Sequence, residues 1–600
     1  MHNTDPNVLQ GVGCVATQIA KITLPAEGLR LSSGSVLREL EVAYECYGEL
    51  NPRKDNVVFI CTALTGDAHA AGYHTSPEND LGWWDAMIGP GRGIDTRYYH
   101  VVCANILGGC KGTTGPASLN PGTGKAYGAD FPVIDVADIV DVHCLLLKHL
   151  GISHLAAIIG GSFGGMQVLE WLVRYPDMVD HAICIATAAS LSAQALAFDS
   201  LARAMITEDA GWRDGNYYEE GPGPVSGLAH ARQLGHITYL SQEIMMSKFG
   251  REQRASIPED LSTARIPEFQ VASYLDHQGR KFVGRFDANS YLRVMMAMDH
   301  FDLKQRYQGG LREAFSAIRA KVLVVAVTSD WLFPSTQSKE IANALLQAQK
   351  DVSYCELDVP YGHDAFLVDI ENLVAAVQAF LPWIPDGNAE RAFAGQEDLS
   401  LSCSHTRNTL SSMIRRGARV LDVGCGDGAL LAALDQQCEV EGFGVDIDFS
   451  QVVQVMNRGY SVVQTDIDQG LAMIPDDAYD YAVLRETLQV VRHPRTVMQS
   501  LLRVAPECIV AFPNFAYYRV VGQLLFRGRM PVGSALPFAW YETPNIHLFT
   551  LLDFESLCKQ EGWQIKDRSY DYDDWFGKVL GRVGIPNRGA ARVLLRVTRS

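Results

Sequence analysis

Residues 158–166, with the sequence IIGGSFGGM, decide the fold of the first half of this 600-residue chain. The apolar run at 154–159 leads into them and has the composition of a buried parallel strand. Residues 166–172 leave with helical periodicity. The G-x-S-x-G pattern predicts a tight turn that holds the Ser162 hydroxyl above a sheet edge, at the N-terminus of a helix. We therefore predict that Ser162 is a nucleophile, rather than an incidental serine in a glycine-rich turn.

Length, charge and cysteine content limit the possible classes of protein. A chain of 600 residues is longer than one hydrophobic core usually organises, so two or three domains are expected. A net charge of −18 argues against nucleic acid as a partner. The sequence has no signal-like N-terminus and no apolar run that could span a bilayer, so we expect a cytoplasmic protein without a membrane partner. The 13 cysteines follow no disulfide or zinc pattern, so we expect reduced thiols and no metal site.

Two later strands each end near a residue that could activate a serine. The apolar segment 321–327 is followed by Asp330, and the segment 352–357 is followed by His363. Taken separately, an aspartate often only caps a helix, and a histidine often only lies in a loop. The order Ser162, Asp330, His363, with each residue near a strand end, is that of the catalytic triad of α/β-hydrolases. We therefore predict an α/β-hydrolase fold with these three catalytic residues.

The same fold predicts an oxyanion hole and an inserted cap. One oxyanion N–H comes from the loop after the strand at 57–61, which indicates Leu64, and the other comes from Phe163, directly after the nucleophile. A plain surface turn is the alternative for Leu64. Because 168 positions separate Ser162 from Asp330, we predict a helical cap at about 190–310. The methionine-rich run 291–298 is expected in its core.

Five motifs, in this order, resemble the homoserine O-acyltransferases of the MetX type, a branch of the α/β-hydrolase superfamily. The resemblance covers residues from about 15 to 385. The motifs are ALTGDAH at 63–69, GGCKGTTGP at 108–116, GGSFGGMQ at 160–167, SDWLFP at 329–334 and GHDAFL at 362–367. The family transfers an acyl group from acyl-CoA to the hydroxyl of L-homoserine in methionine biosynthesis. The resemblance therefore implies acyl-CoA as co-substrate and a ping-pong reaction.

The resemblance also implies roles for residues that would be unremarkable by themselves. It implies that Arg232 binds the homoserine carboxylate and that Asp364 binds its ammonium, although the first reads otherwise as a solvated helix residue and the second as a helix cap. Leu332 is implicated in acyl-CoA specificity. Succinyl-CoA is the favoured donor over acetyl-CoA, with Lys111 or a cap arginine available to neutralise the extra carboxylate. A homodimer through the cap is also implied.

The second half begins after a predicted linker at 386–409. Residues 418–428 (ARVLDVGCGDG) predict a strand followed by a glycine-rich turn, which contains Asp422, Gly424, Gly426 and Gly428. Asp446 ends the next strand, where a carboxylate can accept hydrogen bonds from ribose hydroxyls. The pattern resembles class I S-adenosylmethionine-dependent methyltransferases, in which Asp466 would contact adenine. An NAD-binding Rossmann domain is the alternative, although its G-x-G-x-x-G spacing differs.

Residues 475–481 (PDDAYDY) and 540–548 (WYETPNIHL) resemble the MetW family. That family accompanies methionine biosynthesis, so the resemblance implies an accessory role and S-adenosylmethionine as ligand. We therefore predict an acyltransferase domain at 1–385 and a MetW-like Rossmann-type α/β domain at 410–600. Two alternatives stay open. The first half could pass its acyl group to water as a serine esterase, and the second half could be an active methyltransferase, whose acceptor the sequence does not identify.

Overall fold

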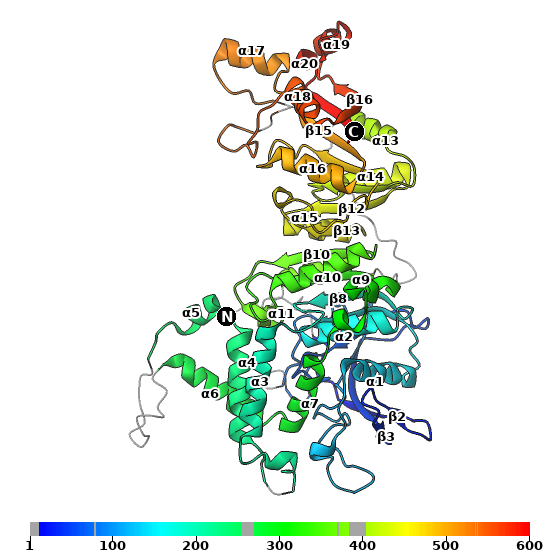
Figure 1. Cartoon of the computed structure of the whole chain (residues 1–600), viewed down its shortest axis with the longest axis vertical. Helices are drawn as coiled ribbons and strands as arrows, with labels where there is room; N and C mark the ends of the chain where they lie inside the picture. The colour runs from blue at the N-terminus through cyan, green and yellow to red at the C-terminus, as the bar shows by residue number, and fades with distance from the viewer. Residues whose placement is uncertain are drawn as a thin grey trace, which may run out of the picture. The chain divides into compact units, whose positions relative to one another are not determined.

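The computed structural model describes residues 11–76, 80–219, 221–253, 269–368, 371–382, 404–533, 536 and 538–599 (Figure 1). The chain divides into two compact units, Met1–Arg391 and Ala392–Ser600. Residues 386–403 of the predicted linker lie outside the described residues. Residues 404–409 begin helix α13 (Ser404–Met413), so this part of the predicted linker is helical instead. Among the described residues, no helix has the length and apolar character needed to cross a membrane.

A mixed, mostly parallel sheet forms the centre of the first unit. The described strands follow the order β1-β4-β6-β5-β7-β8-β9-β10, with β1 and β4 antiparallel at one edge and parallel pairs from β6 onward. Every residue of β5 and β7 is buried, because helices cover both faces, which explains their continuous apolar composition. The bounds are β1 Gln18–Lys21, β4 Glu41–Tyr47, β5 Val57–Cys61, β6 His100–Ala104, β7 Leu155–Gly161, β8 Val179–Ile185, β9 Lys321–Val327 and β10 Val352–Leu357.

Helices α1, α2, α10 and α12 pack around this sheet. Their bounds are Val136–His149, Phe163–Arg174, Ser335–Gln347 and Glu371–Phe380. Helix α1 begins with a capping box, in which the Asp135 carboxylate accepts from the Asp138 N–H at 2.9 Å and the Asp138 carboxylate accepts from the Asp135 N–H at 3.0 Å. A small hairpin of β2 (Leu29–Arg30) and β3 (Val36–Leu37) lies apart from the main sheet. Since β5, β7, β9 and β10 are parallel, their C-terminal ends meet at one edge.

The segment between β8 and β9 is helical and forms a second layer with its own core. In Figure 1, helices α3 and α4 run side by side. Met295 is fully buried in the apolar cluster of this layer, together with Tyr291 and Leu228, which confirms that the methionine-rich run is cap core. The helices are α3 Ala193–Thr207, α4 Val225–Tyr239, α5 Gln242–Phe249, α6 Gln270–Val283, α7 Ala288–Asp299, α8 Leu303–Arg306 and α9 Gly310–Ala314.

The second unit also has a central parallel sheet. Its described strands follow the order β13-β12-β11-β14-β15-β17-β16, in which β17 pairs antiparallel with both of its neighbours. This order reverses direction at β11, so the crevice after β11 is the expected ligand position of such a sheet. The strands are β11 Arg419–Val423, β12 Glu441–Asp446, β13 Ser461–Gln464, β14 Tyr481–Arg485, β15 Glu507–Pro513, β16 Gln564–Asp571 and β17 Arg592–Thr598.

The helices of the second unit alternate with these strands as in a βαβ fold. Helix α14 follows the glycine-rich turn after β11, and α15 begins at Phe449, shortly after β12, where the Asp448 carboxylate caps it. The bounds are α14 Ala429–Cys438, α15 Phe449–Asn457, α16 Pro494–Val504, α17 Tyr518–Arg527, α18 Leu551–Glu561, α19 Trp575–Arg582 and α20 Pro586–Gly589.

Candidate active site

Ser162 lies in a strained turn between β7 and α2. Its φ of 57° and ψ of −124° are unusual for a residue with a side chain. The turn closes only because its neighbours are glycines. A Cβ at Gly164 would lie 2.3 Å from the carbonyl oxygen of Cys61, and a Cβ at Gly165 would lie 2.5 Å from the Cβ atom of Thr187. The predicted strand, turn and helix are therefore present, and the serine hydroxyl lies at the beginning of α2.

The structure brings Ser162, His363 and Asp330 into one hydrogen-bonded chain. The Nε2 atom of His363 lies 2.7 Å from the Ser162 hydroxyl, and its Nδ1 atom lies 2.7 Å from Oδ2 of Asp330. The other oxygen of Asp330 accepts from the backbone N–H groups of Leu332 and Phe333, each at 2.9 Å. All three side chains are buried. Asp330 is thus fixed on both oxygens, and it fixes the imidazole in turn.

The electrostatics of this chain favour a basic histidine. Burial by itself lowers the pKa of His363, but the charge and hydrogen bond of Asp330, with a contribution from Asp364, raise it above its ordinary value. The ring of Phe333 stacks on the imidazole with centroids 5.0 Å apart. His363 can therefore take a proton from Ser162 and hold the positive charge beside Asp330.

The two predicted oxyanion donors, Leu64 and Phe163, both belong to segments at Ser162. Phe163 is the first residue of α2, and Leu64 lines the same cavity as Ser162. Within the described part of the chain, neither backbone N–H has a hydrogen-bond acceptor. The buried side chain of Gln167 donates to the carbonyl of Thr62 at 2.9 Å and so ties the loop after β5 to helix α2. Neither amide is therefore used by a described acceptor, and the oxyanion-hole assignment stays a prediction.

A pocket opens at Ser162 beneath the cap. Leu332, the residue predicted to affect acyl-CoA specificity, is among the residues that line it. The walls of the pocket are mainly apolar and aromatic. Of the described residues that line it, none is a lysine or an arginine. The lining residues are Leu64, Ser162, Leu191, Ala195, Phe198, Asp199, Ala202, Ala231, Leu234, Gly235, Thr238, Tyr239, Tyr291, Met298, Leu332 and Phe333.

Asp199 is the one carboxylic acid in that lining. Burial, together with the hydrogen bond and charge of Asp299, raises the pKa of Asp199 to about 8. Asp299 in turn is ion-paired with Arg203. Two neighbouring carboxyl groups therefore lie between α3 and α7, and one of them belongs to the pocket wall. The sequence analysis did not single out this pair, since no spacing in the sequence relates residue 199 to residue 299.

Arg232 lies on α4 and faces the active-site loops. Its guanidinium packs over the rings of Tyr239 at 5.5 Å and Phe282 at 4.8 Å, and it donates to the Thr65 hydroxyl at 3.3 Å. Among the residues that the structure describes, no carboxylate forms an ion pair with it. Sequence analysis missed Tyr239, although its place seven residues after Arg232 puts both on one helix face.

Asp364 follows the catalytic histidine in the short helix η5 (Gly362–Asp364). Burial raises its pKa, whereas the positive charges of His363 and Arg232 oppose that rise. Asp364 and Arg232 therefore interact electrostatically across the site. A ligand that carries both an ammonium and a carboxylate would complement the two.

The end of α4 anchors the cap to both triad loops. The indole N–H of Trp331 donates to the carbonyl of Leu240 at 3.0 Å, and the Ser241 hydroxyl hydrogen-bonds the carbonyl of Pro360. Gly362 has a φ of +77°, and a Cβ there would lie 2.5 Å from the backbone nitrogen of Ser241. The cap is therefore hydrogen-bonded to the two loops that carry Asp330 and His363, and it also covers them.

The second unit contains the predicted glycine-rich turn after β11. Gly424, Gly426 and Gly428 all have positive φ, and a Cβ at Gly424 would lie 2.5 Å from the Thr487 hydroxyl. Asp446, at the end of β12, accepts from the N–H of Gly426 at 2.9 Å. These contacts place the turn at the crevice after β11. A ligand in this crevice could approach the backbone of the turn, because glycines have no side chain.

Asp422 and Asp466 occupy different environments near this turn. Asp422 is buried, its Oδ2 has no hydrogen-bond partner among the described residues, and burial raises its pKa to about 7 although Arg485 lowers it. Asp466 follows β13 and accepts from the N–H of Asp468 at 2.9 Å. A buried carboxyl group without a described partner, beside a glycine-rich turn, suits a ligand with hydrogen-bond donors.

Family models match both units of the chain. The model described as the alpha/beta hydrolase fold matches residues 56–370, and the model described as methionine biosynthesis protein MetW matches residues 405–579. A bifunctional methionine biosynthesis protein MetXA/MetW of Rhodopirellula baltica is 40% identical over 558 residues, which cover 90% of this chain and 87% of the relative. The chain belongs to the MetX-type homoserine O-acyltransferase family and carries a MetW domain. The family and α/β-hydrolase fold predictions are confirmed.

Within this family, relatives with different acyl groups are similarly close. A homoserine O-acetyltransferase of Methanosalsum zhilinae is 49% identical, over 62% of this chain and 75% of the relative. A homoserine O-succinyltransferase of Hahella chejuensis is 47% identical, over 62% of this chain and 95% of the relative. Sequence identity alone therefore does not select between acetyl and succinyl donors.

Solved structures similar to the first unit include a transferase and a hydrolase. Homoserine O-acetyltransferase from Bacillus anthracis has a TM-score of 0.57 and 29% identity, over 62% of this chain and 98% of that one. Esterase E22 has a TM-score of 0.56 and 29% identity, over 61% of this chain and 100% of that one. The fold thus serves both acyl transfer and ester hydrolysis, and the substrate ligands must decide between them.

Proposed function

We propose that the first unit transfers an acyl group from acyl-CoA to the hydroxyl of L-homoserine, in methionine biosynthesis. The observation that carries this proposal is the combination of the Ser162–His363–Asp330 chain with Arg232, which forms no ion pair with a described carboxylate, and with Asp364 beside the histidine. The first group of residues supports acyl-enzyme chemistry. The second group supports an amino-acid acceptor.

In the first half-reaction, His363 Nε2 removes the Ser162 hydroxyl proton as the serine oxygen attacks the thioester carbonyl. The carbonyl oxygen becomes negative and receives hydrogen bonds from the Leu64 and Phe163 N–H groups. Asp330 stabilises the resulting imidazolium through Nδ1. The carbon–sulfur bond then breaks, His363 returns its proton to the leaving sulfur, and CoA departs as the thiol.

In the second half-reaction, homoserine binds in the place that CoA vacates. Arg232 pairs with its carboxylate as a planar fork, and Asp364 pairs with its ammonium. His363 takes the proton of the side-chain hydroxyl, whose oxygen attacks the acyl carbonyl, and the proton then returns to Ser162 as the ester bond to the enzyme breaks. Transfer exceeds hydrolysis because the bound alcohol is positioned and water is not.

For the acyl donor, the cavity supports acetyl-CoA, in contrast to the succinyl-CoA that the sequence analysis favoured. A succinyl group brings a carboxylate that must be paired or solvated when it is buried. The described lining offers no cation, and it contains the acidic Asp199. Lys111 is the candidate partner of the succinyl carboxylate in the sequence analysis, but its Nζ atom lies 3.8 Å from Oδ2 of Asp67. We therefore propose the O-acetyltransferase activity first and the O-succinyltransferase activity as the outcome that would displace it.

The serine esterase alternative has support in the similarity to esterase E22. It differs from the transferase in one measurable respect, because an esterase releases CoA without homoserine. The test incubates the full chain with acetyl-CoA or succinyl-CoA and follows thiol release with and without homoserine. Release that depends on homoserine, with O-acylhomoserine as product, supports the transferase. Equal thiol release without homoserine would contradict the transferase activity and support the esterase activity.

We propose that the second unit binds S-adenosylmethionine at Gly424–Gly428 and Asp446 in a role accessory to the acyltransferase. The positive-φ glycines and the unpartnered Asp422 carboxyl group support binding, whereas no described residue arrangement identifies a methyl acceptor. Calorimetry with S-adenosylmethionine tests binding. Methyl transfer to any acceptor from a cell extract would favour the active methyltransferase instead.

We also propose that the chain pairs with a second copy through its cap. Apolar side chains are exposed on the outer surfaces of α3, α4 and α5, which supports burial in an interface. They are Leu196, Leu201, Ile237 and Met246. Light scattering would give a dimer mass for the natural chain and a monomer mass for Leu201→Asp combined with Ile237→Asp. A monomer at all concentrations of the natural chain would contradict the proposal.

A further inference from the structure

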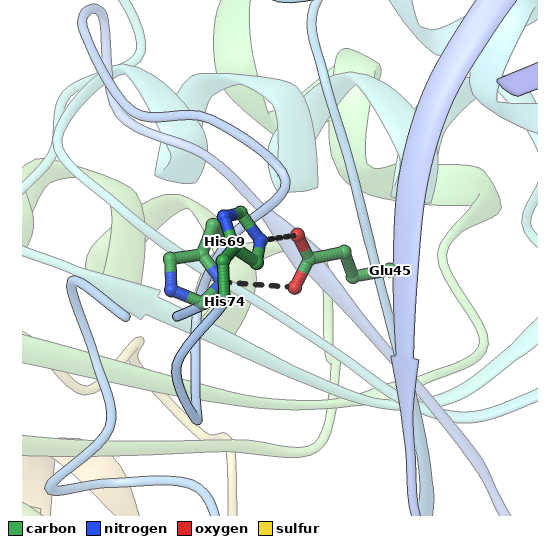
Figure 2. A group of neighbouring side chains, drawn as sticks. All are labelled: Glu45, His69 and His74. Atoms are coloured by element: carbon green, nitrogen blue, oxygen red, sulfur yellow. Dashed lines mark hydrogen bonds and ion pairs between the residues drawn. The ribbon is translucent and has the colours of Figure 1, made fainter. Parts of the chain in front are cut away.

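Glu45 is a fully buried carboxylate with two histidines directed at it. Oε1 lies 2.9 Å from Nε2 of His74, and Oε2 lies 3.0 Å from Nδ1 of His69 (Figure 2). The hydroxyls of Thr17 and Tyr47 donate to the same carboxylate at 2.7 and 2.9 Å. Glu45 lies on β4, whereas both histidines lie in the long connection after β5, so the contact joins segments far apart in the sequence.

The hydrogen bonds of His69 define where its protons must be. Its Nε2 atom lies 2.7 Å from the carbonyl oxygen of Asp80, which can only accept, so Nε2 carries a hydrogen. Its Nδ1 atom faces the Glu45 carboxylate, which also accepts. Nδ1 must therefore carry a second proton, or a cation must lie between Nδ1 and the carboxylate. The reaction of the first unit uses none of these groups.

We propose that Glu45, His69 and His74 form a binding site for a divalent zinc-class cation. The ligand atoms of the three residues all lie within 4.8 Å of one another. Figure 2 shows both imidazole rings approaching the two oxygens of the carboxylate. Two imidazoles and one carboxylate are a donor set that Zn²⁺ and Co²⁺ accept, with water in the remaining position.

The surrounding groups fit this role. A histidine that binds metal through one nitrogen commonly donates its other N–H to a backbone carbonyl, as His69 does to Asp80. Bonds of about 2.0–2.1 Å in a tetrahedron place neighbouring ligand atoms about 3.3 Å apart, so the present 2.9 and 3.0 Å contacts need to open by only a few tenths of an ångström. The His74 side chain is 37% exposed, which leaves a path for the ion and for a water ligand.

When the metal ion binds, it takes the place of the imidazole protons that face Glu45. His69 loses its Nδ1 proton to solvent, and His74 moves its single proton from Nε2 to Nδ1. The Glu45 carboxylate stays ionised, and the ion replaces the two N–H donors that it received. Such a site would fix residues 69–74 to β4, and through them the loop that begins with Leu64, so metal binding should stabilise the folded chain.

The experiment uses the full chain, freed of metal with a chelator, and Co²⁺ as a spectroscopic probe. We expect one Co²⁺ per chain, visible d–d absorption typical of a tetrahedral N/O site, release of about one proton per ion at neutral pH, and a higher Tm with Zn²⁺. His74→Gln should weaken binding by at least about 100-fold and abolish the Tm shift. His74 is part of the surface, so the variant should fold.

His154→Gln is the matched control. The His154 side chain is also 37% exposed, and its Nε2 atom lies 2.9 Å from Oδ2 of Asp180. Among the described residues, however, it belongs to no group of three potential metal ligands. It should bind Co²⁺ like the natural chain. The inference is overturned if the natural chain takes up no Co²⁺, or if His74→Gln and His154→Gln bind it equally. Either result would assign the cluster to protons alone, with His69 doubly protonated against Glu45.

Discussion

Each unit of the chain contains a glycine-rich turn between a buried parallel strand and a helix, and the two turns differ in what they hold. In the first unit, the residue with positive φ at the turn is Ser162, at 57°. In the second unit three glycines have positive φ, namely Gly424 at 70°, Gly426 at 54° and Gly428 at 80°. In the first turn, a side chain with positive φ presents a hydroxyl to a substrate, whereas the glycines of the second turn leave room for a ligand to approach the backbone.

The surroundings of the two turns follow the same division. Around Ser162, a buried histidine and aspartate form a relay for protons. Around Gly426, carboxylates predominate, and Asp446 binds the turn itself. The comparison teaches that the strand–turn–helix unit places a residue at the N-terminus of a helix. The side chains nearby then decide between covalent chemistry and binding. Changes in one turn should therefore leave the function of the other intact.

The largest effect is expected from Ser162→Ala. Loss of the nucleophile should lower homoserine-dependent thiol release by about 10⁶-fold. Binding of S-adenosylmethionine to the second unit should stay unchanged, and calorimetry on the same sample provides the control for folding. Thiol release at the natural rate would show that another group carries the acyl chain.

Asp330→Asn should lower the rate by about 10⁴-fold, because the imidazole loses its orienting charge. The variant also tests the raised pKa of His363. The reaction needs neutral His363, so the rate of the natural chain rises with pH through a pKa above the ordinary value of 6.5. Without the Asp330 charge, the residual rate should rise at lower pH. A profile that does not move would remove Asp330 from the relay.

Arg232→Lys should lower kcat/KM for homoserine by about 100-fold, since lysine cannot form the bidentate pair. Acylation of Ser162 by acyl-CoA should continue, so the ratio of hydrolysis to transfer rises. Steady-state kinetics with varied homoserine, beside single-turnover acylation, separate the two steps. An equal loss in both steps would make Arg232 a structural residue of the cap.

Asp446→Asn should weaken S-adenosylmethionine binding by about 10- to 100-fold, through loss of an ionised acceptor. Acyl transfer should not change. Asp448→Asn, two residues later, is the control, because asparagine caps a helix as well as aspartate does. If both variants bind the ligand like the natural chain, the pocket at Gly424–Gly428 is assigned wrongly.

The smallest effect concerns the acyl group. Leu332→Arg places a guanidinium in the cavity wall and should raise the ratio of succinyl to acetyl transfer by about tenfold. Leu332→Met, which keeps an apolar side chain of similar volume, should leave that ratio unchanged. Competition between the two acyl-CoA donors in one reaction measures it directly. An unchanged ratio in Leu332→Arg would place the specificity elsewhere in the cavity.

Much of the fold could be predicted, because buried parallel strands leave a continuous apolar pattern. The predicted segments 57–61, 321–327 and 352–357 coincide with β5, β9 and β10. The segment at 154–159 became β7 (Leu155–Gly161), extended by two glycines that belong to the turn. Cys103, Cys144 and Cys184 lie in apolar runs, and they are buried and free.

The site could be predicted only where a motif marks it. Ser162, Asp330 and His363 follow strand ends, so their convergence could be expected. The Asp199–Asp299 pair and the anchoring of Trp331 on Leu240 depend on how cap helices pack, which no spacing in the sequence encodes. The cluster of Glu45, His69 and His74 could not be predicted for the same reason, since the tertiary fold brings Glu45 to histidines in a later loop.

The central claim is that Ser162 carries the acyl group and passes it to an amino-acid alcohol. Mass spectrometry of the full chain after brief exposure to acetyl-CoA, without homoserine, tests this most directly. We predict one acetyl group on the peptide that contains Ser162, and its prompt loss on addition of homoserine, with O-acetylhomoserine as product. An unmodified Ser162, or an acetyl-serine that homoserine does not discharge, would contradict the account.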